Sequence, residues 1–222
     1  MSKRSPGSKS RKKLRSGLFI SFEGVDGTGK STQIRLLAAR LKKMGKRVLI
    51  LREPGGTRIG EKIRHLLQYD RGALKMAPTT ETLLFCASRA QLVNEKILPA
   101  LARGQVVLTD RFMDSTTVYQ GIGRNLGAQT IEKLHEFSIG RCRPDLTLVL
   151  VMRPEASLKR ARRSSRGYDR MEAQKKSFYE SIHRGYAALS RREPRRFKWI
   201  CAERSRSEVH ADVWKETRKK VR

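Results

Sequence analysis

The residues best suited to chemistry form one short run near the start of the chain. Glycines at the spacing of this run let a backbone turn bring its N–H groups to phosphate oxygens. Lys30 supplies a cation for the β- and γ-phosphates of a nucleotide, and the Ser31 hydroxyl can coordinate Mg²⁺. A bare glycine-rich turn is the alternative interpretation. We predict that a nucleotide binds the whole run, which consists of Gly24, Val25, Asp26, Gly27, Thr28, Gly29, Lys30, Ser31 and Thr32.

This motif requires a strand before the loop and a helix after it. Residues 18–22 are a short apolar run that predicts a buried strand, and residues 32–44 carry apolar side chains at helical spacing. The strand, loop and helix therefore occur in the order that nucleotide binding needs. We expect Lys30 to be a surface cation in the folded protein, so that its loss affects catalysis and not stability.

The rest of the chain alternates strands and helices. Strands are predicted at residues 47–51, 106–108, 146–151 and 197–201, with helices at about 59–67 and 78–103. Five strands separated by helices predict an α/β fold with a parallel sheet covered on both faces. Ligands of such sheets gather at the carboxyl ends of the strands. The side chains predicted at those ends include Glu53, Asp110 and Arg153.

Charged side chains near these strand ends indicate a second ligand. Asp110 closes an apolar strand, where a carboxylate can hold Mg²⁺ through water. Arg64, Arg89 and Arg111 carry forked N–H donors that suit a phosphate or a base carbonyl. In so basic a chain each arginine is equally well interpreted as a solvated surface residue, and composition alone does not decide between the two.

Length and composition limit the class of protein. A chain of 222 residues suits one α/β domain, and no apolar run approaches the ~20 residues that span a bilayer. A soluble protein without membrane contact is therefore expected. The three cysteines, Cys86, Cys142 and Cys201, are far apart and lack metal-ligand spacing, which is typical of reduced thiols in a cytosolic protein.

The chain is strongly basic, with 50 Lys and Arg against 21 Asp and Glu and a formal charge of +29. Residues 1–17 hold seven basic residues, five serines and no acid, which predicts a disordered tail before a domain at 18–222. Removing the tail still leaves +22 on the domain. A nucleic-acid-binding protein has such a charge, and so does an enzyme with a solvated basic surface.

Several ordered motifs carry a family resemblance. A single phosphate-binding loop occurs in many families, but the whole series resembles that of the bacterial thymidylate kinases from about residue 18 to residue 190. The motifs are Phe22 to Thr32, then Arg52-Glu53-Pro54-Gly55-Gly56-Thr57, Leu84-Phe85-Cys86-Ala87-Ser88-Arg89, Asp110-Arg111-Phe112 with Tyr119-Gln120-Gly121, and Asp169-Arg170-Met171-Glu172.

The resemblance implies both a fold and a reaction. The fold is that of the P-loop nucleoside monophosphate kinases, with a five-stranded parallel sheet. The reaction transfers the γ-phosphoryl group of ATP to dTMP and gives dTDP, a step of dTTP synthesis, with ATP and Mg²⁺ bound. It also implies a homodimer, which the cysteine pattern predicts to be cytoplasmic.

The resemblance further implies roles for residues around the acceptor nucleotide. Asp26 matches the acid that contacts the 3′-hydroxyl of the deoxyribose, and Glu53 belongs to the predicted substrate site. Phe85 matches the aromatic that stacks on thymine, and Arg89 matches the donor to the thymine O4. The remaining matches are Arg64 and Arg111 at the acceptor phosphate, Thr116 and Gln120 near the base, and Tyr119 under the sugar.

The catalytic cation is predicted to come from a lid at about residues 154–170. Some family members carry an arginine in the phosphate-binding loop, where this chain has Gly27, and others supply it from a mobile lid. This chain resembles the lid type, and we expect Arg162 and Arg166 to join Lys30, Asp26 and Asp110 in catalysis. The candidate lid arginines are Arg160, Arg162, Arg163 and Arg166.

Two alternative functions remain at this stage. One is another nucleoside monophosphate kinase of the same fold, which a panel of acceptor nucleotides would reveal. The other is a P-loop ATPase associated with nucleic acid, which predicts ATP hydrolysis stimulated by polynucleotide and salt-dependent binding. The sequence contains no recognisable nucleic-acid-binding module. An intact kinase whose basic tail makes weak contacts with nucleic acid or another polyanion combines the two.

Overall fold

A computed structural model describes residues 17–68, 76–162 and 176–221. The predicted tail, apart from Gly17, and the part of the predicted lid after residue 162 lie outside the described residues. Within the described ranges, every helix is too short or too polar to cross a lipid bilayer.

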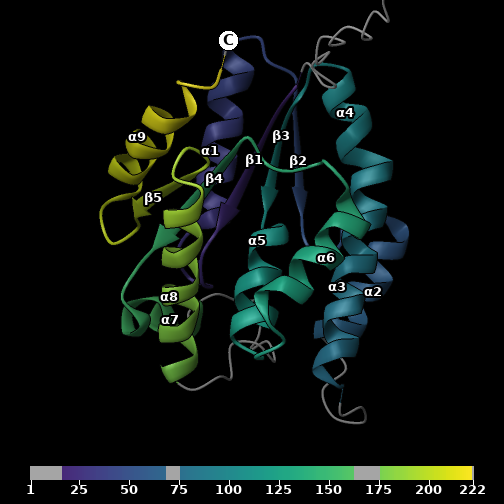
Figure 1. The fold of residues 1–222 in the computed structure, drawn as a ribbon. Helices are drawn as coiled ribbons and strands as arrows, with labels where there is room; N and C mark the ends of the chain where they lie inside the picture. The colour runs from purple at the N-terminus through teal and green to yellow at the C-terminus, as the bar shows by residue number, and fades with distance from the viewer. Residues whose placement is uncertain (1–16, 69–75, 163–175, 222) are drawn as a thin grey trace, which may run out of the picture.

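The strands form one parallel sheet in the order β2-β3-β1-β4-β5 (Figure 1). All five predicted strands are confirmed, and β1, β2 and β3 each end one or two residues later than predicted, at charged residues. Their bounds are β1 Leu18–Glu23, β2 Val48–Arg52, β3 Val106–Asp110, β4 Leu146–Val151 and β5 Phe197–Cys201.

The register of the sheet aligns the carboxyl ends of three neighbouring strands, β2, β3 and β1. Phe22 of β1 and Arg52 of β2 both pair with Asp110 of β3. The segments that begin at Gly24, Glu53 and Arg111 therefore leave the sheet at one edge. This is the edge where ligands bind open α/β sheets.

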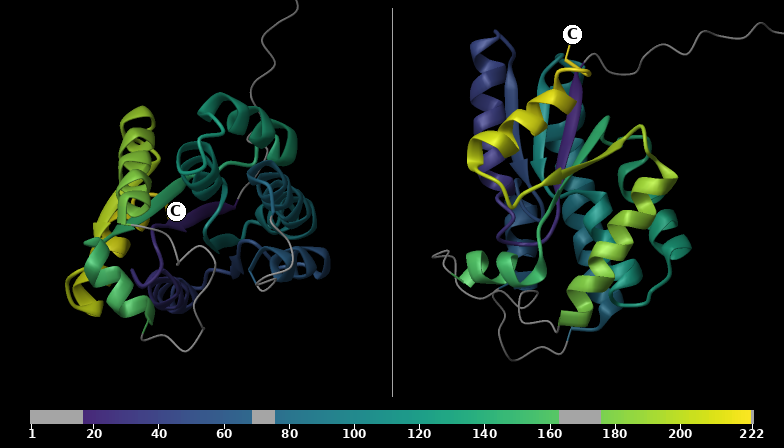
Figure 2. Two further views of the ribbon diagram at one scale, coloured as in Figure 1. Left: turned by 90° about the horizontal axis from the view of Figure 1, so that it is seen from below. Right: turned by 90° about the vertical axis from the view of Figure 1, so that its left-hand side faces the viewer.

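Helices cover both faces of the sheet (Figure 2). One apolar core lies between the sheet and helices α1 and α9, and two more lie on the other face, against the helices from α3 to α6 and against α8. The helices before β3 are α1 Lys30–Lys43, α2 Arg58–Gln68, α3 Pro78–Leu92 and α4 Leu98–Ala102. The later helices are α5 Met113–Thr116, α6 Ala128–Ile139, α7 Pro154–Arg162, α8 Lys176–Arg192 and α9 Arg206–Thr217.

Two of the segments that the structure describes are π-helical, with wider turns than an α-helix. The first, η1 at Val93–Ile97, lies between α3 and α4, so the single helix predicted at 78–103 is an interrupted one. The second, η2 at Thr117–Ile122, continues α5 and contains Tyr119 and Gln120. Single π-helical turns are rare and occur often at functional sites.

His135 of α6 makes the fold sensitive to acid. The ring is fully buried and its Nε2 lies 2.9 Å from the Thr117 hydroxyl oxygen. Burial, with Arg89 and Arg143 nearby, lowers the pKa of His135 to about 2. The unfolded chain therefore binds a proton below pH 6.5 that the folded chain does not bind, so acid favours unfolding.

We expect this difference to remove about 2 kcal/mol of stability between pH 7.5 and pH 5. The measurement is urea unfolding at both pH values for the native chain and for His135→Gln, which cannot take up the proton. The variant should lose about 2 kcal/mol less than the native chain over this range. Equal losses in the two proteins would contradict the role given to His135.

Candidate active site

The loop predicted to bind phosphate joins β1 to α1 and turns sharply at its glycines. Gly24 has φ 123° and Gly29 has φ 90°, values that L side chains rarely adopt. A Cβ on Gly24 would also lie 2.3 Å from the carbonyl oxygen of Leu150. Glycine at position 24 is therefore required for both conformation and space, and α1 begins directly after the loop at Lys30.

Lys30 is buried, so the expectation of a surface cation is wrong. Its side chain is 5% exposed, and the ammonium donates hydrogen bonds of 3.0 Å to the carbonyl oxygens of Gly24 and Val25. The long side chain folds back into the loop because these carbonyls offer acceptors. Burial, together with Arg111, lowers the pKa of Lys30.

Ser31 and Asp110 meet at the start of α1 and the end of β3. The Ser31 hydroxyl donates a 2.7 Å hydrogen bond to the Asp110 carboxylate. Mg²⁺ binds proteins through few oxygen ligands and takes the rest of its shell from water and substrate phosphates. The two oxygens fit that donor set, although the described part of the chain holds no cluster of three or more His, Cys, Asp or Glu for a metal.

Arg111, Asp26 and Tyr119 form one cluster beside the loop. A single nitrogen of the Arg111 guanidinium lies 2.9 Å from both Asp26 carboxylate oxygens, and the other donates to the Tyr119 hydroxyl at 3.3 Å. The guanidinium carbon lies 5.1 Å from the centre of the Tyr119 ring. Three residues with predicted roles at the acceptor nucleotide are thus brought together.

The charges of this cluster follow from the contacts among its members, since the Asp26 side chain is 43% exposed. Burial acts to raise the pKa of Asp26, but Arg111 and Lys30 outweigh it and hold that pKa well below its usual range. Burial also raises the pKa of Tyr119 to about 12. At neutral pH the cluster therefore contains an ionised Asp26, a cationic Arg111 and a neutral phenol.

Arg89, Glu53 and Thr116 form a second, buried cluster. The Arg89 side chain is 1% exposed and donates at 2.8 Å to Glu53 and at 2.7 Å to the Thr116 hydroxyl. Burial raises the pKa of Glu53, and Arg89 opposes that shift. Arg89 Nη1 and Glu53 Oε1 have no hydrogen-bond partner in the part of the chain that the structure describes. A buried cation with a spare donor favours a ligand acceptor beside it.

The other predicted site residues make separate contacts. Gln120 is buried and donates a 2.9 Å hydrogen bond to Glu81, a residue that the sequence analysis did not single out. Arg64 donates to the carbonyl oxygen of Pro54 at 2.8 Å, next to Glu53. Phe85 is half-buried on α3, one turn before Arg89.

The predicted lid is described only in its first part. Pro154–Arg162 forms α7, which ends at Arg162. Arg160 of this helix donates to the carbonyl oxygen of Ala202 at 3.1 Å. Arg163 and Arg166 lie outside the described residues, so their predicted roles are not tested.

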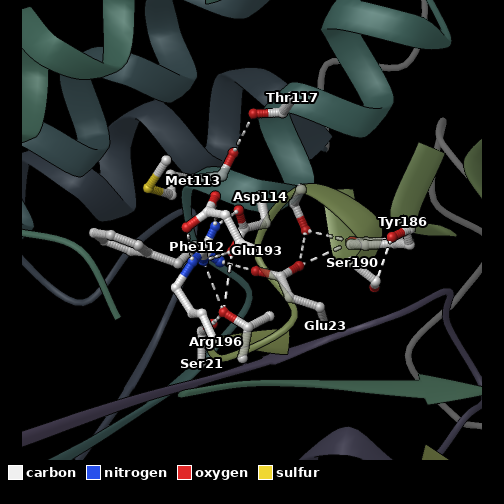
Figure 3. Close-up of polar contacts among 12 residues, drawn as sticks. Ser21, Glu23, Phe112, Met113, Asp114, Thr117, Tyr186, Ser190, Glu193 and Arg196 are labelled. Carbon is white, nitrogen blue, oxygen red and sulfur yellow. Dashed lines mark hydrogen bonds and ion pairs between the residues drawn. The ribbon is translucent and has the colours of Figure 1, made fainter. Parts of the chain in front are cut away.

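Glu23 lies within the motif from Phe22 to Thr32, but the sequence predicts no role for it. Its fully buried carboxylate accepts hydrogen bonds from the Phe112 amide, from Ser115 and from Tyr186 of α8 (Figure 3). A charged residue that ends an apolar strand directly before Gly24 was the signal that could have identified it.

Comparison with known proteins identifies the family. Residues 22–213 match the family model described as Thymidylate kinase. The chain belongs to the thymidylate kinase family. Thymidylate kinase of Thermoanaerobacter sp. (strain X514) is 45% identical over 197 residues, which cover 89% of this chain and 95% of that protein. Thymidylate kinase of Caldanaerobacter subterraneus subsp. tengcongensis is 47% identical over 199 residues, covering 90% of this chain and 94% of that protein.

A solved structure extends the likeness to three dimensions. The crystal structure of thymidylate kinase from Ehrlichia chaffeensis has a TM-score of 0.73 and 31% sequence identity, and covers 91% of this chain and 98% of that one. The predicted fold class is therefore confirmed. The chain is a P-loop enzyme of the thymidylate kinase family with a five-stranded parallel sheet.

Proposed function

We propose that this enzyme transfers the γ-phosphoryl group of ATP to dTMP and produces dTDP for dTTP synthesis. Membership of the thymidylate kinase family supports the reaction. The choice of acceptor is supported by the buried Arg89, which pairs with Glu53 directly after β2 and has one N–H group without a hydrogen-bond partner. The O4 of thymine is an acceptor that this donor would match.

The loop residues bind the ATP phosphates. Phosphate oxygens take the place of the Gly24 and Val25 carbonyls as partners of the Lys30 ammonium, and loop N–H groups, with that of Thr32, line the phosphates. Ser31 and Asp110 would hold Mg²⁺, which neutralises charge on the transferred phosphate. No covalent intermediate is needed, because a phosphate monoester is a competent nucleophile and the residues supply position and charge.

The acceptor nucleotide lies between the two clusters. The dTMP phosphate competes with Asp26 for the Arg111 guanidinium and meets Arg64 as its second cation. Asp26, freed from Arg111, accepts from the 3′-hydroxyl of the sugar. Around the sugar and base we place Tyr119, Phe85, Arg89, Glu53, Thr116 and Gln120.

Closure of the lid completes the site. We propose that Arg162 or Arg166 reaches the transferred phosphoryl group when the lid closes, and that closure excludes water that would otherwise accept the group. Loop residue Gly27 offers no side-chain cation in this position.

We further propose a cytoplasmic homodimer. Phe137 of α6 is 93% exposed, and Leu83 of the neighbouring helix α3 is 52% exposed. Large apolar side chains on adjacent helices suit a surface that a second chain covers.

The described cysteines are free thiols, which fit a reducing compartment. For the basic tail, which lies outside the described residues except for Gly17, we propose weak contacts with nucleic acid or another polyanion.

A panel of acceptor nucleotides tests the proposed substrate. In a coupled assay with ATP we expect kcat/KM to be highest for dTMP, and to be roughly ten- to hundredfold lower for UMP than for dUMP, because a 2′-hydroxyl over Tyr119 clashes or loses its partners. The 5-methyl group contributes about 0.8 kcal/mol, so dUMP remains a detectable substrate. Replacing the O4 acceptor by an amino donor opposite Arg89 should place dCMP below dUMP.

Variants of Tyr119 provide the matched controls for this panel. Tyr119→Phe keeps the ring and should leave the ranking of acceptors unchanged. Tyr119→Ala removes the ring and should narrow the preference for deoxy over ribo acceptors. Equal kcat/KM values for dTMP and dCMP would argue for another nucleoside monophosphate kinase of the same fold.

A further inference from the structure

The buried carboxylate of Glu23 gathers donors from three parts of the fold (Figure 3). One oxygen accepts the backbone N–H of Phe112 at 2.8 Å. The other accepts the Ser115 hydroxyl at 2.5 Å and the Tyr186 hydroxyl at 2.9 Å. The end of β1, the turn after β3 and helix α8 are therefore joined at one side chain.

The partners of Glu23 contact Arg111 at two places, its backbone and its side chain. Arg111 has φ 69°, a left-handed conformation that is uncommon for a residue other than glycine and persists only when neighbouring structure holds it. Glu23 fixes the next amide in the chain, that of Phe112. It also fixes Ser115, whose hydroxyl oxygen lies 3.3 Å from a nitrogen of the Arg111 guanidinium. Partners of Glu23 thus contact both the backbone and the side chain of Arg111, whose guanidinium is also held by Asp26.

The contact with Tyr186 brings α8 into the same arrangement. Tyr186 is 2% exposed, and its hydroxyl lies 3.3 Å from that of Ser115 as well as 2.9 Å from Glu23. Helix α8 begins at Lys176, where the described part of the chain resumes after residue 162. A carboxylate at this junction connects the position of α8 with that of Arg111.

A purely architectural role explains this side chain poorly. Burying a carboxyl is unfavourable, and burial together with Asp114 raises the pKa of Glu23 to about 7, against the opposing effect of Ser115, Arg111 and Tyr186. An apolar residue at the end of β1 would avoid this cost.

We propose that Glu23 is a positioning residue for phosphoryl transfer, which acts through Arg111 by clamping the Phe112 amide, Ser115 and Tyr186 around it. The inference rests on the proposed role of Arg111 at the acceptor phosphate. Glu23 itself does not touch the reacting groups.

A double-mutant cycle separates positioning from general destabilisation. Glu23→Gln keeps the shape of the side chain and should lower kcat/KM for dTMP by about 10- to 100-fold, the cost of a slightly misplaced binding group. The KM for ATP should stay within roughly twofold of the native value, because the ATP loop keeps its contacts. In the Arg111→Ala background, Glu23→Gln should cause less than about a twofold further loss. Losses that multiply across the two positions would overturn the inference.

Two further comparisons keep the test decisive. Val213→Ala, in the α9 core on the other face of the sheet, provides a destabilised control, and its KM for dTMP should equal that of the native chain. If Glu23→Gln does not fold, Ser115→Ala and Tyr186→Phe each remove one donor and should raise the KM for dTMP without raising the KM for ATP. If Arg111→Ala leaves the KM for dTMP unchanged, the role of Arg111 is wrong and this inference falls with it. If the losses of the two variants multiply, the inference about Glu23 is wrong, but the proposed role of Arg111 still stands.

Discussion

Lys30→Ala is expected to lower kcat by about 10³-fold or more, because the transferred phosphate loses its fixed cation in a site that excludes water. The Lys30 ammonium is held within the loop by two carbonyl oxygens, 3.0 Å away in each case. The ammonium therefore already lies at the proposed phosphate site, and no other side chain of the loop carries a positive charge. Steady-state kinetics with saturating ATP and dTMP measures the loss.

The burial of Lys30 also changes what is expected of stability. Removing the ammonium leaves the carbonyl oxygens of Gly24 and Val25 without this donor, which we expect to cost about 1 to 3 kcal/mol. Circular dichroism during urea unfolding measures this cost. Lys42→Ala, on an exposed position of the same helix, is the matched control and should change neither quantity. A folded Lys30→Ala protein that keeps most of its activity would contradict the assignment of the loop.

Replacing the catalytic lid arginine should have an effect of similar size. By analogy with arginine fingers, Arg162→Ala or Arg166→Ala is expected to lower kcat by about 10³-fold and to change KM far less, since the contact forms mainly in the transition state. The lid has to supply this cation because the phosphate-binding loop has Gly27 at the position where other family members have an arginine. Single-turnover kinetics with each variant identifies which arginine reaches the phosphoryl group.

A control on α7, the helix that ends at Arg162, makes this experiment specific. Lys159 is an exposed cation of α7, so Lys159→Ala changes the charge of the helix by the same amount. Its kcat should stay close to that of the native chain. If Arg160, Arg162, Arg163 and Arg166 can be replaced singly and together with little change in kcat, the required cation comes from another part of the protein.

The sheet was predictable because its strands are strongly apolar and lie between clear turn signals. The periodicity of residues 78–103 did not distinguish an α-helix from one interrupted by a π-helical segment, since both place apolar side chains on one face. The burial of Lys30 was missed for a different reason. Motif spacing places its backbone at the loop, but the direction of a long, flexible side chain depends on which acceptors lie nearby.

Contacts between distant parts of the chain explain what else sequence reasoning could not reach. Asp26 and Arg111 are 85 positions apart, and only the family resemblance linked them before the structure did. Glu23 and Tyr186 are 163 positions apart, with no shared motif to associate them. Local patterns specify elements well, whereas such a contact exists only after the strands have been ordered.

The π-helical segment Thr117–Ile122 affects how the specificity of the proposed acceptor site can change. Tyr119 and Gln120 lie within the segment, so their directions depend on the number of residues in the turn as well as on their identity. Deleting one residue there would restore α-helical winding and rotate the side chains on one side of the deletion by about 100° relative to those on the other. A scan of point substitutions leaves this variable untouched. Insertions and deletions of single residues would sample a set of acceptor pockets that substitutions do not reach.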